Sequence, residues 1–485
     1  MSFNRSRLCS ALALCVLVSP AMAGDAVDER IARIELGLLP RNVIQGQPLP
    51  TASLAARMAA LKVPGASIAV INNGSIEWAR GYGVAEAGSA RVVTPQTLFQ
   101  AASISKPLTA MTALNLVEHG KLSLDEDVNA RLTTWKVPPG AQTAANPVTL
   151  RALLNHSAGT TVSGFRGYAQ GAAVPTLIEV LDGAKPANSP SVRVDKSPGE
   201  AFRYSGGGLS IVQLLMTTAS GKPFAPLMKD VLLDPLGMHN STYEQPLPPA
   251  LHGAAASAHD ANGVPYIGKW HTYPEQAAAG LWTTPSDLAR FAIELQNASM
   301  GKSNKIVSPA MATQMLTRLK GTWGLGIGVG TSDGLPTFNH GGANAGFRTL
   351  MFAFTTTGKG AVIMTNGDRG DVLTAEVMRS IAAEYGWSDY RVTEKTLAKV
   401  DPKLYAHFVG NYALDGVTIS VVQEGERLFV KAPQLRPDPV QLLPASETRY
   451  FNLADTVEFA FEQDAAGTYD LIIKAGQPRR AKRVP

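Results

Sequence analysis

The chain has 485 residues, a formal net charge of +5 and two cysteines. This length exceeds what one compact core usually holds, so at least two domains are expected. Both cysteines, Cys9 and Cys15, lie in an N-terminal segment expected to be removed, which excludes disulfides, thiol catalysis and cysteine-bound metals from the mature chain. No block of Lys and Arg is interleaved with aromatic residues, which argues against nucleic acid as a partner.

Residues 1–23 have the pattern of a secretory signal peptide. Arg5 and Arg7 form a basic start, residues 8–18 are apolar, and Ala21-Met22-Ala23 is a small-residue cleavage site. The apolar stretch is too short to cross a bilayer, and no later stretch is apolar enough, so no stable membrane anchor is expected. We therefore expect export across a bacterial inner membrane, a periplasmic location, and a mature chain with a charge of +3.

After a loose leader expected at 24–50, the pattern predicts helices and strands in mixed order. The expected strands form an antiparallel sheet, and helices precede and follow them in the sequence. This arrangement predicts an α+β fold, built as an α/β sandwich, with a helical subdomain within 120–300. In chain order, the expected elements are a helix at 51–61, strands at 66–71 and 75–83 joined by a turn at Asn72-Asn73-Gly74, a strand at 97–101, a helix at 106–119, a buried helix within 205–221, strands at 323–329, 349–354 and 360–365, and a closing helix at 371–385.

The sequence changes character after Tyr385. A charged linker is expected at 389–400, and residues 401–485 are rich in short strands such as Val457 to Glu462, where apolar and other residues alternate. The expected domains are therefore a signal peptide at 1–23, a catalytic domain at 24–388 and a small all-β, barrel-like domain at 401–485. The basic cluster at 479–483 is expected to be a solvated tail.

The strongest candidate for chemistry is Ser103-Ile104-Ser105-Lys106, where a short strand runs into a helix. Residues three apart on a helix share one face, with Cβ atoms roughly 5–6 Å apart, so Ser103 and Lys106 can meet. The positive end of the helix dipole favours developing negative charge at the hydroxyl, and a desolvated lysine can take the serine proton. Ser299-Met300-Gly301-Lys302 has the same pattern in a predicted turn, so the pattern alone decides nothing.

Two further segments carry candidate site residues. Tyr204 precedes a glycine-rich turn into a helix, where its hydroxyl can face a cleft or be satisfied in the core. His340-Gly341-Gly342 precedes an expected strand; the glycines let a substrate backbone approach, and His340 can bind a polar or anionic group or lie alone at the surface. His156 is expected to brace loops. The histidine spacing does not fit zinc, so neither a metal nor a cofactor is expected.

Five segments, taken together and in order, carry a resemblance to a known family. They are Phe99-Gln-Ala-Ala-Ser-Ile-Ser-Lys106, Leu153-Leu-Asn-His-Ser-Ala-Gly159, Phe202-Arg-Tyr-Ser-Gly-Gly-Gly208, Ala279-Gly-Leu-Trp-Thr-Thr-Pro-Ser-Asp-Leu288 and His340-Gly-Gly-Ala-Asn-Ala-Gly-Phe347. Over about residues 50–390 the chain resembles the serine β-lactamase and penicillin-binding protein superfamily, in its class C-like, peptidase S12-type branch. Residues 401–485 resemble the lipocalin-like β domains that follow some of these proteins.

The resemblance implies a role for each matching residue. Ser103 is the acylated nucleophile, Lys106 its activating base and Tyr204 a second proton carrier. The backbone N–H of Ser103 forms half of the oxyanion hole, and the strand after His340 supplies the other N–H, at Asn344 or a neighbour. The residues implied in substrate binding are His340, Gly341, Gly342, Gly206 and Asn344.

Two positions depart from the family pattern. Gly206 stands where the second motif usually ends in asparagine, so the contacts of that asparagine to the lysine and the substrate amide are lost or moved. His340 stands where enzymes that bind the β-lactam carboxylate often have lysine, and a histidine is expected to be only partly charged near neutral pH. Both changes weaken a β-lactamase interpretation and suit an esterase or a D-amino-acid peptidase at least as well.

The sequence therefore predicts an exported serine hydrolase that forms an acyl-enzyme at Ser103. Its substrate is a small molecule or peptide with an ester, a D-amino-acid amide or a β-lactam bond. The alternative is a non-catalytic or very slowly deacylating module that binds penicillin or a cell-wall peptide, motivated by Gly206.

Overall fold

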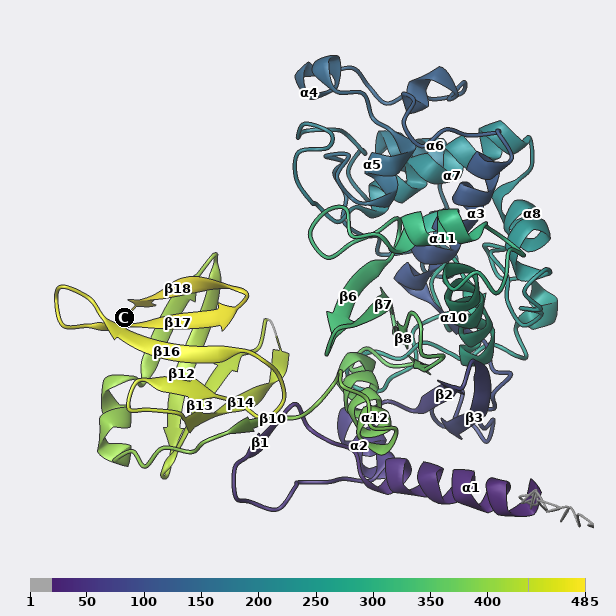
Figure 1. Ribbon diagram of the computed structural model, residues 1–485. Helices are drawn as coiled ribbons and strands as arrows, with labels where there is room; N and C mark the ends of the chain where they lie inside the picture. The colour runs from purple at the N-terminus through teal and green to yellow at the C-terminus, as the bar shows by residue number, and fades with distance from the viewer. Residues whose placement is uncertain (1–19, 435, 485) are drawn as a thin grey trace, which may run out of the picture.

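The computed structural model describes residues 20–434 and 436–484. A body of mixed helices and strands lies beside a separate β-barrel (Figure 1). Cys9, Cys15 and most of the predicted signal peptide lie outside the described residues. Within the described residues no helix is both long and apolar enough to cross a membrane.

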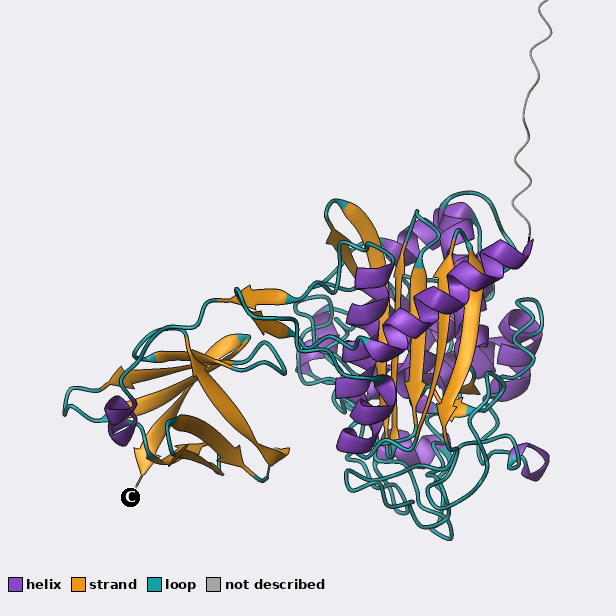
Figure 2. Cartoon of the chain, turned by 90° about the horizontal axis from the view of Figure 1, so that it is seen from below, coloured by secondary structure: helices purple, strands orange, loops and turns teal. Residues whose placement is uncertain are grey.

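The larger body is built around a six-stranded antiparallel sheet with strand order β3-β2-β9-β8-β7-β6. All but one of the residues of β2 are buried, because helices cover both faces of the sheet (Figure 2). The α+β fold expected from the sequence is confirmed. The strands are β2 (Gly65–Asn72), β3 (Ser75–Gly83), β6 (Gly328–Ser332), β7 (Leu335–Asn344), β8 (Phe347–Phe354) and β9 (Gly360–Thr365), with a separate pair β4 (Phe99–Gln100) and β5 (Trp282–Thr283).

Helices on one face of the sheet share a core with strands β2, β8 and β9, and the helical subdomain packs on the other face. The first group is α1 (Pro20–Leu36), α2 (Leu54–Leu61) and α12 (Gly370–Glu384). The second group is α3 (Ser105–Glu118), α4 (Ala141–Ala145), α5 (Leu150–Leu154), α6 (Leu177–Asp182), α7 (Gly206–Ser220), α8 (Phe224–Met228), α9 (Gln276–Ala279), α10 (Pro285–Ser299) and α11 (Pro309–Leu316).

The expected loose leader at 24–50 is wrong. Helix α1 runs to Leu36 and buries Ile31 and Ile34 against the core of the first helical group. These two apolar residues are three apart, which is the spacing of one helix face. The segment is therefore held by packing on the sheet body.

The expected strand at 323–329 is also wrong, because β6 starts only at Gly328. Trp323 forms isolated bridges to Lys320 and Gly328, and Gly326, in the turn between Trp323 and Gly328, has a positive φ of 74°. A Cβ on Gly326 would lie 2.4 Å from the Cβ of Ala110, so this turn packs directly on α3. In addition, His340 lies inside β7 and not before a strand.

The C-terminal domain is a closed antiparallel barrel of eight strands, as the resemblance implied. Its core includes Tyr412, Tyr450 and Phe461. The strands are β11 (Gly410–Leu414), β12 (Val417–Glu424), β13 (Arg427–Ala432), β14 (Arg436–Pro444), β15 (Arg449–Phe451), β16 (Glu458–Gln463), β17 (Tyr469–Ala475) and β18 (Gln477–Val484).

The basic cluster at 479–483 is not a solvated tail. It forms β18, which pairs with both β11 and β17 and so closes the barrel. Ala481 faces the core with no exposed surface, whereas Arg480 on the outside pairs with Glu462 and Asp470. The buried Ala481 and the ion pairs of Arg480 thus account for the place of this basic segment in the barrel.

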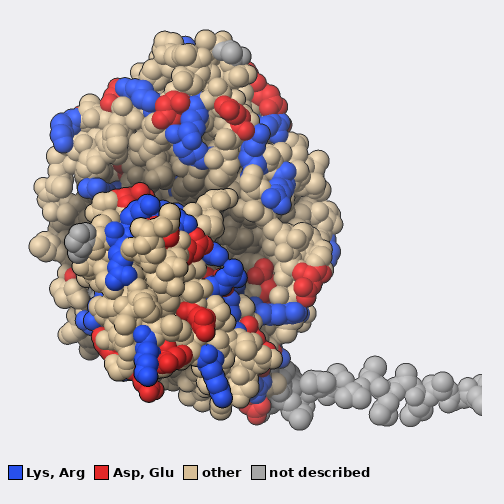
Figure 3. Space-filling view, turned by 90° about the vertical axis from the view of Figure 1, so that its left-hand side faces the viewer, with Lys and Arg blue, Asp and Glu red and all other residues tan. Residues whose placement is uncertain are grey.

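The expected linker at 389–400 contains a strand, β10 (Thr393–Lys395), which pairs in parallel with β1 (Asn42–Ile44). The Nδ2 atom of Asn42 also donates to the carbonyl of Asn452, at 2.6 Å, and so joins the start of the chain to the barrel. On the face shown in Figure 3, basic and acidic side chains are interspersed over both bodies, with no extended region of one sign.

Candidate active site

Ser103 lies on a tight 3₁₀ turn, Ala102–Ile104, between β4 and α3. Ala102 has a φ of +50°, which is uncommon for a residue with a Cβ and marks a strained turn. Ala101, Ala102 and Ile104 are completely buried, whereas Ser103 is partly exposed. The turn therefore presents one hydroxyl outward from an otherwise buried segment.

Lys106 lies one helical turn further on, with 2% of its surface exposed. Its Nζ is 2.8 Å from Ser103 Oγ and donates to the carbonyl oxygen of Ala278, also at 2.8 Å. No carboxylate forms an ion pair with this amine in the described part of the chain. A buried amine that contacts a hydroxyl and no acid is placed to exchange a proton with that hydroxyl.

Helix α9 fixes the position of this pair. Thr109 Oγ1 donates to the carbonyl of Ala277 at 3.2 Å, next to the Ala278 carbonyl that Lys106 contacts. Tyr243 donates to the Ser105 carbonyl at 2.9 Å. The sequence did not predict α9, and four residues rich in alanine carry no periodic signal that could have revealed it.

Strand β7 approaches the nucleophile turn at Gly342. A Cβ there would lie 2.2 Å from the carbonyl oxygen of Ala101, so only glycine allows this separation. Strands β7 and β8 are joined by a two-residue turn, so Asn344 and Phe347 form a hydrogen-bonded pair. Hydrogen-bonded and non-hydrogen-bonded pairs alternate along an antiparallel ladder, so Ala343–Arg348 is non-hydrogen-bonded and Gly342–Thr349 is hydrogen-bonded again. The N–H of Ala343 therefore faces the free edge of β7 and can act as the second oxyanion donor in place of that of Asn344.

The side chain of Asn344 is buried and has protein partners. Its Nδ2 donates to Gln100 Oε1 at 2.8 Å and to the Ala279 carbonyl at 3.1 Å. These contacts tie β7 to β4 and to the end of α9. The amide group of Asn344 thus holds the walls of the site together.

Tyr204 precedes α7, whose N-cap Ser205 accepts from the N–H of Gly208 at 3.0 Å. The centroid of the Tyr204 ring is 5.0 Å from Lys106 Nζ, which brings the third predicted catalytic residue to the other two. Its hydroxyl forms no hydrogen bond with the described residues, so it is free to interact with a ligand.

An aromatic cluster surrounds Tyr204, formed by His156, Phe202, Trp323 and His340. Trp323 packs edge-on against both imidazoles, with centroids 5.1 Å apart in each case. The sequence placed Trp323 in a strand and gave it no role. Its aromatic neighbours come from three other segments, so no local pattern could have revealed it.

His156 is 1% exposed, and its Nδ1 accepts from the N–H of Ser205 at 3.3 Å. Its carbonyl accepts from the N–H of Arg203 at 2.7 Å. Burial, then Lys106 and His340, hold the pKa of His156 well below 6.5. His156 is neutral and accepts hydrogen bonds from the backbone on both sides of Tyr204, so it braces this loop, as expected.

His340 is not partly charged, in contrast to the expectation from the sequence. It is 3% exposed, and burial followed by the nearby Lys106 lowers its pKa from 6.5 to about 3. Its Nδ1 donates to the Gly341 carbonyl at 2.7 Å, while Nε2 is buried and has no hydrogen-bond partner among the described residues. A neutral His340 cannot attract an anionic group of a substrate by charge.

Gly206 is covered by the loop that follows α5. Its N–H donates to the Ser163 carbonyl at 3.0 Å, and a Cβ would lie 3.0 Å from the ring of Phe165. The space into which an asparagine side chain would extend therefore holds Phe165 and the backbone of this loop. Phe165 can pack in this place because residue 206 is a glycine without a side chain.

The residues around Ser103 enclose a cleft of about 220 Å³. Its lining combines three segments: the nucleophile and its lysine, the loop 163–166, and the facing backbone of α9 and β7. Five of the predicted site residues do not line it: Tyr204, Gly206, His340, Gly341 and Gly342. The residues that do are Ser103, Lys106, Ser163, Gly164, Phe165, Arg166, Ala278, Ala279, Ala343 and Asn344.

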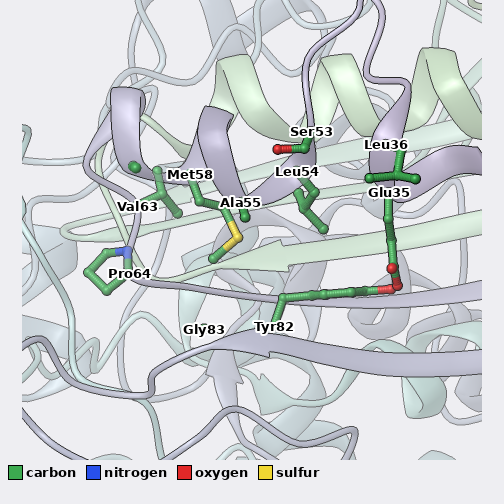
Figure 4. A pocket seen from close by; sticks show the side chains of 11 residues that line it. Glu35, Leu36, Ser53, Leu54, Ala55, Met58, Val63, Pro64, Tyr82 and Gly83 are labelled. Carbon is green, nitrogen blue, oxygen red and sulfur yellow. The ribbon is translucent and has the colours of Figure 1, made fainter. Parts of the chain in front are cut away.

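A cavity of about 580 Å³ lies elsewhere, between α1, α2 and β3 (Figure 4). Leu54, Met58 and Val63 give it an apolar wall, and the Glu35 carboxylate points at the Tyr82 hydroxyl. Its lining contains no lysine or histidine that could activate Ser53. Size alone therefore does not identify the reactive site.

Within the described residues, no group of three or more His, Cys, Asp or Glu side chains is arranged to hold a metal ion. Glu275, just before α9, is fully buried, and neither of its carboxylate oxygens has a hydrogen-bond partner in the part of the chain that the structure describes. Burial raises the pKa of Glu275 from 4.5 to about 7. The sequence gave no signal for this carboxyl.

Comparison with known proteins fits this geometry. The sequence profile of the family described as Beta-lactamase matches residues 51–383, which is more than half of the chain. The chain belongs to the β-lactamase family. Its membership in the serine β-lactamase and penicillin-binding protein superfamily is thereby confirmed, and it is a hydrolase of that superfamily.

One curated relative of this β-lactamase family member matches most of the chain, and another matches less than half of it. Penicillin-binding protein 4* of Bacillus subtilis (strain 168) is 26% identical over 451 residues, covering 86% of this chain and 94% of the relative. Esterase EstB of Burkholderia gladioli is 29% identical over 206 residues, covering 40% of this chain and 52% of the relative.

Solved structures share the fold. The octameric penicillin-binding protein homologue from Pyrococcus abyssi has a TM-score of 0.59 at 21% identity, covering 88% of this chain and 98% of that one. D-amino acid amidase from Ochrobactrum anthropi SV3, complexed with L-phenylalanine, has a TM-score of 0.57 at 19% identity, covering 74% and 99%.

Proposed function

We propose that this chain is an exported serine hydrolase that forms an acyl-enzyme at Ser103 and hydrolyses a small ester or amide. The observation that carries the proposal is the 2.8 Å contact between Ser103 Oγ and the buried Lys106 Nζ. The basic, apolar and small-residue segments of positions 1–23 support export to the periplasm.

In the proposed cycle, Lys106 takes the Ser103 proton and the oxygen attacks the substrate carbonyl. The oxyanion lies between the N–H groups of Ser103 and Ala343, each worth about 3 kcal/mol by analogy with a single oxyanion-hole donor. The proton passes by way of Lys106 and Tyr204 to the leaving group, which departs. Water then hydrolyses the acyl-enzyme, with the same groups acting as base and acid.

The substrate class follows from the cleft and from the relatives. Those relatives include a penicillin-binding protein, an esterase and a D-amino acid amidase, all of which suit attack on an ester, a β-lactam or a D-amino-acid amide. The cleft of about 220 Å³ suits a small acyl group. A neutral His340 leaves the carboxylate of a β-lactam to be bound by another group of the cleft.

A fluorophosphonate probe tests the proposal, because it labels an activated serine covalently. Wild type should be labelled and Ser103→Ala should not. Ser163→Ala is the matched control, because Ser163 lines the same cleft and its hydroxyl forms no hydrogen bond with the described residues. Equal labelling of wild type and Ser103→Ala would remove Ser103 from its role.

The alternative is a module that binds or acylates without turnover, favoured by the replacement of the usual asparagine by Gly206 and Phe165. It predicts one equivalent of a long-lived adduct from nitrocefin or 4-nitrophenyl acetate and no steady-state product. Continued release of nitrophenolate beyond one equivalent, lost in Ser103→Ala, would exclude it.

A further inference from the structure

Arg166 lines the same cleft as the reacting pair, on the loop that covers Gly206. It is exposed, and its guanidinium forms no hydrogen bond or ion pair with the described residues. An arginine presents five donors in a planar fork that matches a carboxylate. A guanidinium with no partner in a cleft is available to bind an anionic ligand.

The backbone around Arg166 is held in place although its side chain is free. The Arg166 carbonyl accepts from His271 Nδ1 at 2.9 Å and from the Tyr273 hydroxyl at 3.3 Å. Gly167 packs so closely on Tyr273 that a Cβ would lie 2.5 Å from its ring. The loop therefore carries Arg166 at a defined place beside the cleft.

Tyr273 also fixes this loop relative to β7. Its hydroxyl accepts from the N–H of Ala345 at 3.0 Å, in the turn directly after the cleft-lining segment Ala343-Asn344. One side chain thus joins the wall that carries Arg166 to the wall that carries the expected oxyanion donor. A substrate held by both walls would be oriented before reaction.

The charges around the cleft agree with an anionic ligand. Lys106 and Arg166 are the basic residues of its lining, and no acidic residue lines it. A cationic side chain such as Arg166 in a concave site raises the local concentration of ligands of opposite sign. Lys106 is buried and engaged with Ser103 and Ala278, which leaves the guanidinium for the ligand.

We propose that Arg166 is a specificity-determining residue that binds a carboxylate of the substrate during acylation of Ser103. The inference rests on the proposed function and deepens it, because it narrows the substrate to esters or amides that carry a free carboxylate. The geometry does not distinguish a carboxylate on the acyl part from one on the leaving group, so the experiment examines both.

The test compares substrates that differ only in charge. On the acyl side the pair is mono-4-nitrophenyl adipate and its methyl ester; on the leaving-group side it is 5-acetoxy-2-nitrobenzoate and the corresponding methyl benzoate. Wild type should show a higher kcat/KM for the acid of one pair. Arg166→Gln should reduce that acid-to-ester ratio by about tenfold to a hundredfold, the range of hydrogen bonds to charged groups.

Two further variants separate charge recognition from a structural effect. Arg166→Lys keeps the charge but not the fork and should retain part of the preference. Arg427→Gln makes the same change on an exposed residue of the barrel and should leave the ratio as in wild type. Because Arg166 is exposed, 0.5 M NaCl should also weaken the preference in wild type.

The outcomes distinguish this inference from the proposed function. Equal acid-to-ester ratios in wild type and Arg166→Gln, with Ser103-dependent turnover of all four compounds, would overturn the role of Arg166 alone. Turnover that persists in Ser103→Ala would overturn the proposed function. A preference for the uncharged esters in wild type would also contradict the role of Arg166.

Discussion

Gly342→Ala should disable the enzyme through geometry alone. The new methyl group would lie 2.2 Å from the carbonyl oxygen of Ala101 and 3.3 Å from the Cβ of Ala102, whereas real Cβ contacts are essentially never shorter than 3.0 Å. Strand β7 and the nucleophile turn must therefore move apart by about 1 Å, and a misplacement of about 1 Å can cost about a hundredfold in rate.

The neighbouring glycine provides the control. A methyl group on Gly341 has 3.9 Å to its nearest neighbour, the Thr349 carbonyl oxygen. Gly341→Ala makes the same chemical change in the same strand without a clash inside the protein, so its free energy of unfolding should stay within about 0.5 kcal/mol of wild type, as for an ordinary surface substitution.

The assay is the kcat for 4-nitrophenyl acetate together with the rate of fluorophosphonate labelling, measured below the melting temperature of each variant. Overpacking should lower the stability of Gly342→Ala by about 1–3 kcal/mol, so near-UV circular dichroism must first show that it is folded. A folded Gly342→Ala with the kcat of wild type, or an equal loss of stability in Gly341→Ala, would refute this account of β7.

Three other perturbations test separate parts of the account. Lys106→Met fills the same space without an amine and should reduce the labelling rate by about 10²–10⁴-fold, the usual contribution of general acid–base catalysis; a rate near wild type would mean that another group takes the proton. The His340 Cε1 proton resonance, assigned by its absence in His340→Gln, should not titrate between pH 5 and 8, because burial lowers the pKa of His340 to about 3; a midpoint near 6.5 would contradict this. Between pH 4.5 and about 7, Glu275 loses its proton in the unfolded chain but keeps it in the folded chain. The free energy of unfolding therefore falls by about 3 kcal/mol as pH rises through this window. Glu275→Gln should therefore raise the free energy of unfolding by up to that amount at pH 8 and little at pH 4.5, and urea titrations at both pH values that show no difference would exclude a buried, proton-bearing carboxyl.

The sequence predicted the parts of the fold that carry local periodicity. The hairpin of β2 and β3, the helix α3 and the strand β9 follow from runs of apolar residues bounded by turn signals. Helix α1 was missed because Ile31 and Ile34 lie among charged residues, and its burial depends on tertiary contact with the sheet body. Strand β18 was missed because its basic residues resemble a tail until Asp470 and Glu462 are placed beside them.

In the site, too, local features were predictable from the sequence and features that depend on tertiary contacts were not. The spacing of Ser103 and Lys106 is a local property of one helix, so the sequence alone could bring them together. The environment of His340 is formed by distant segments, which include Lys106 of helix α3 and Trp323. Burial in this environment lowers the pKa of His340, so a histidine expected to be partly charged is neutral. The register of β7 likewise moves the expected oxyanion donor from Asn344 to Ala343, which required the strand pairing.

The most direct test of the central claim is the location of the acyl group during turnover. Wild type reacting with a 4-nitrophenyl ester is quenched in acid, digested and mapped by mass spectrometry, with Ser103→Ala treated in parallel. The account predicts the added mass of the acyl group on the peptide that contains Ser103, and no adduct in the variant. An acyl group on any other residue, or turnover by Ser103→Ala at the wild-type rate, would contradict it.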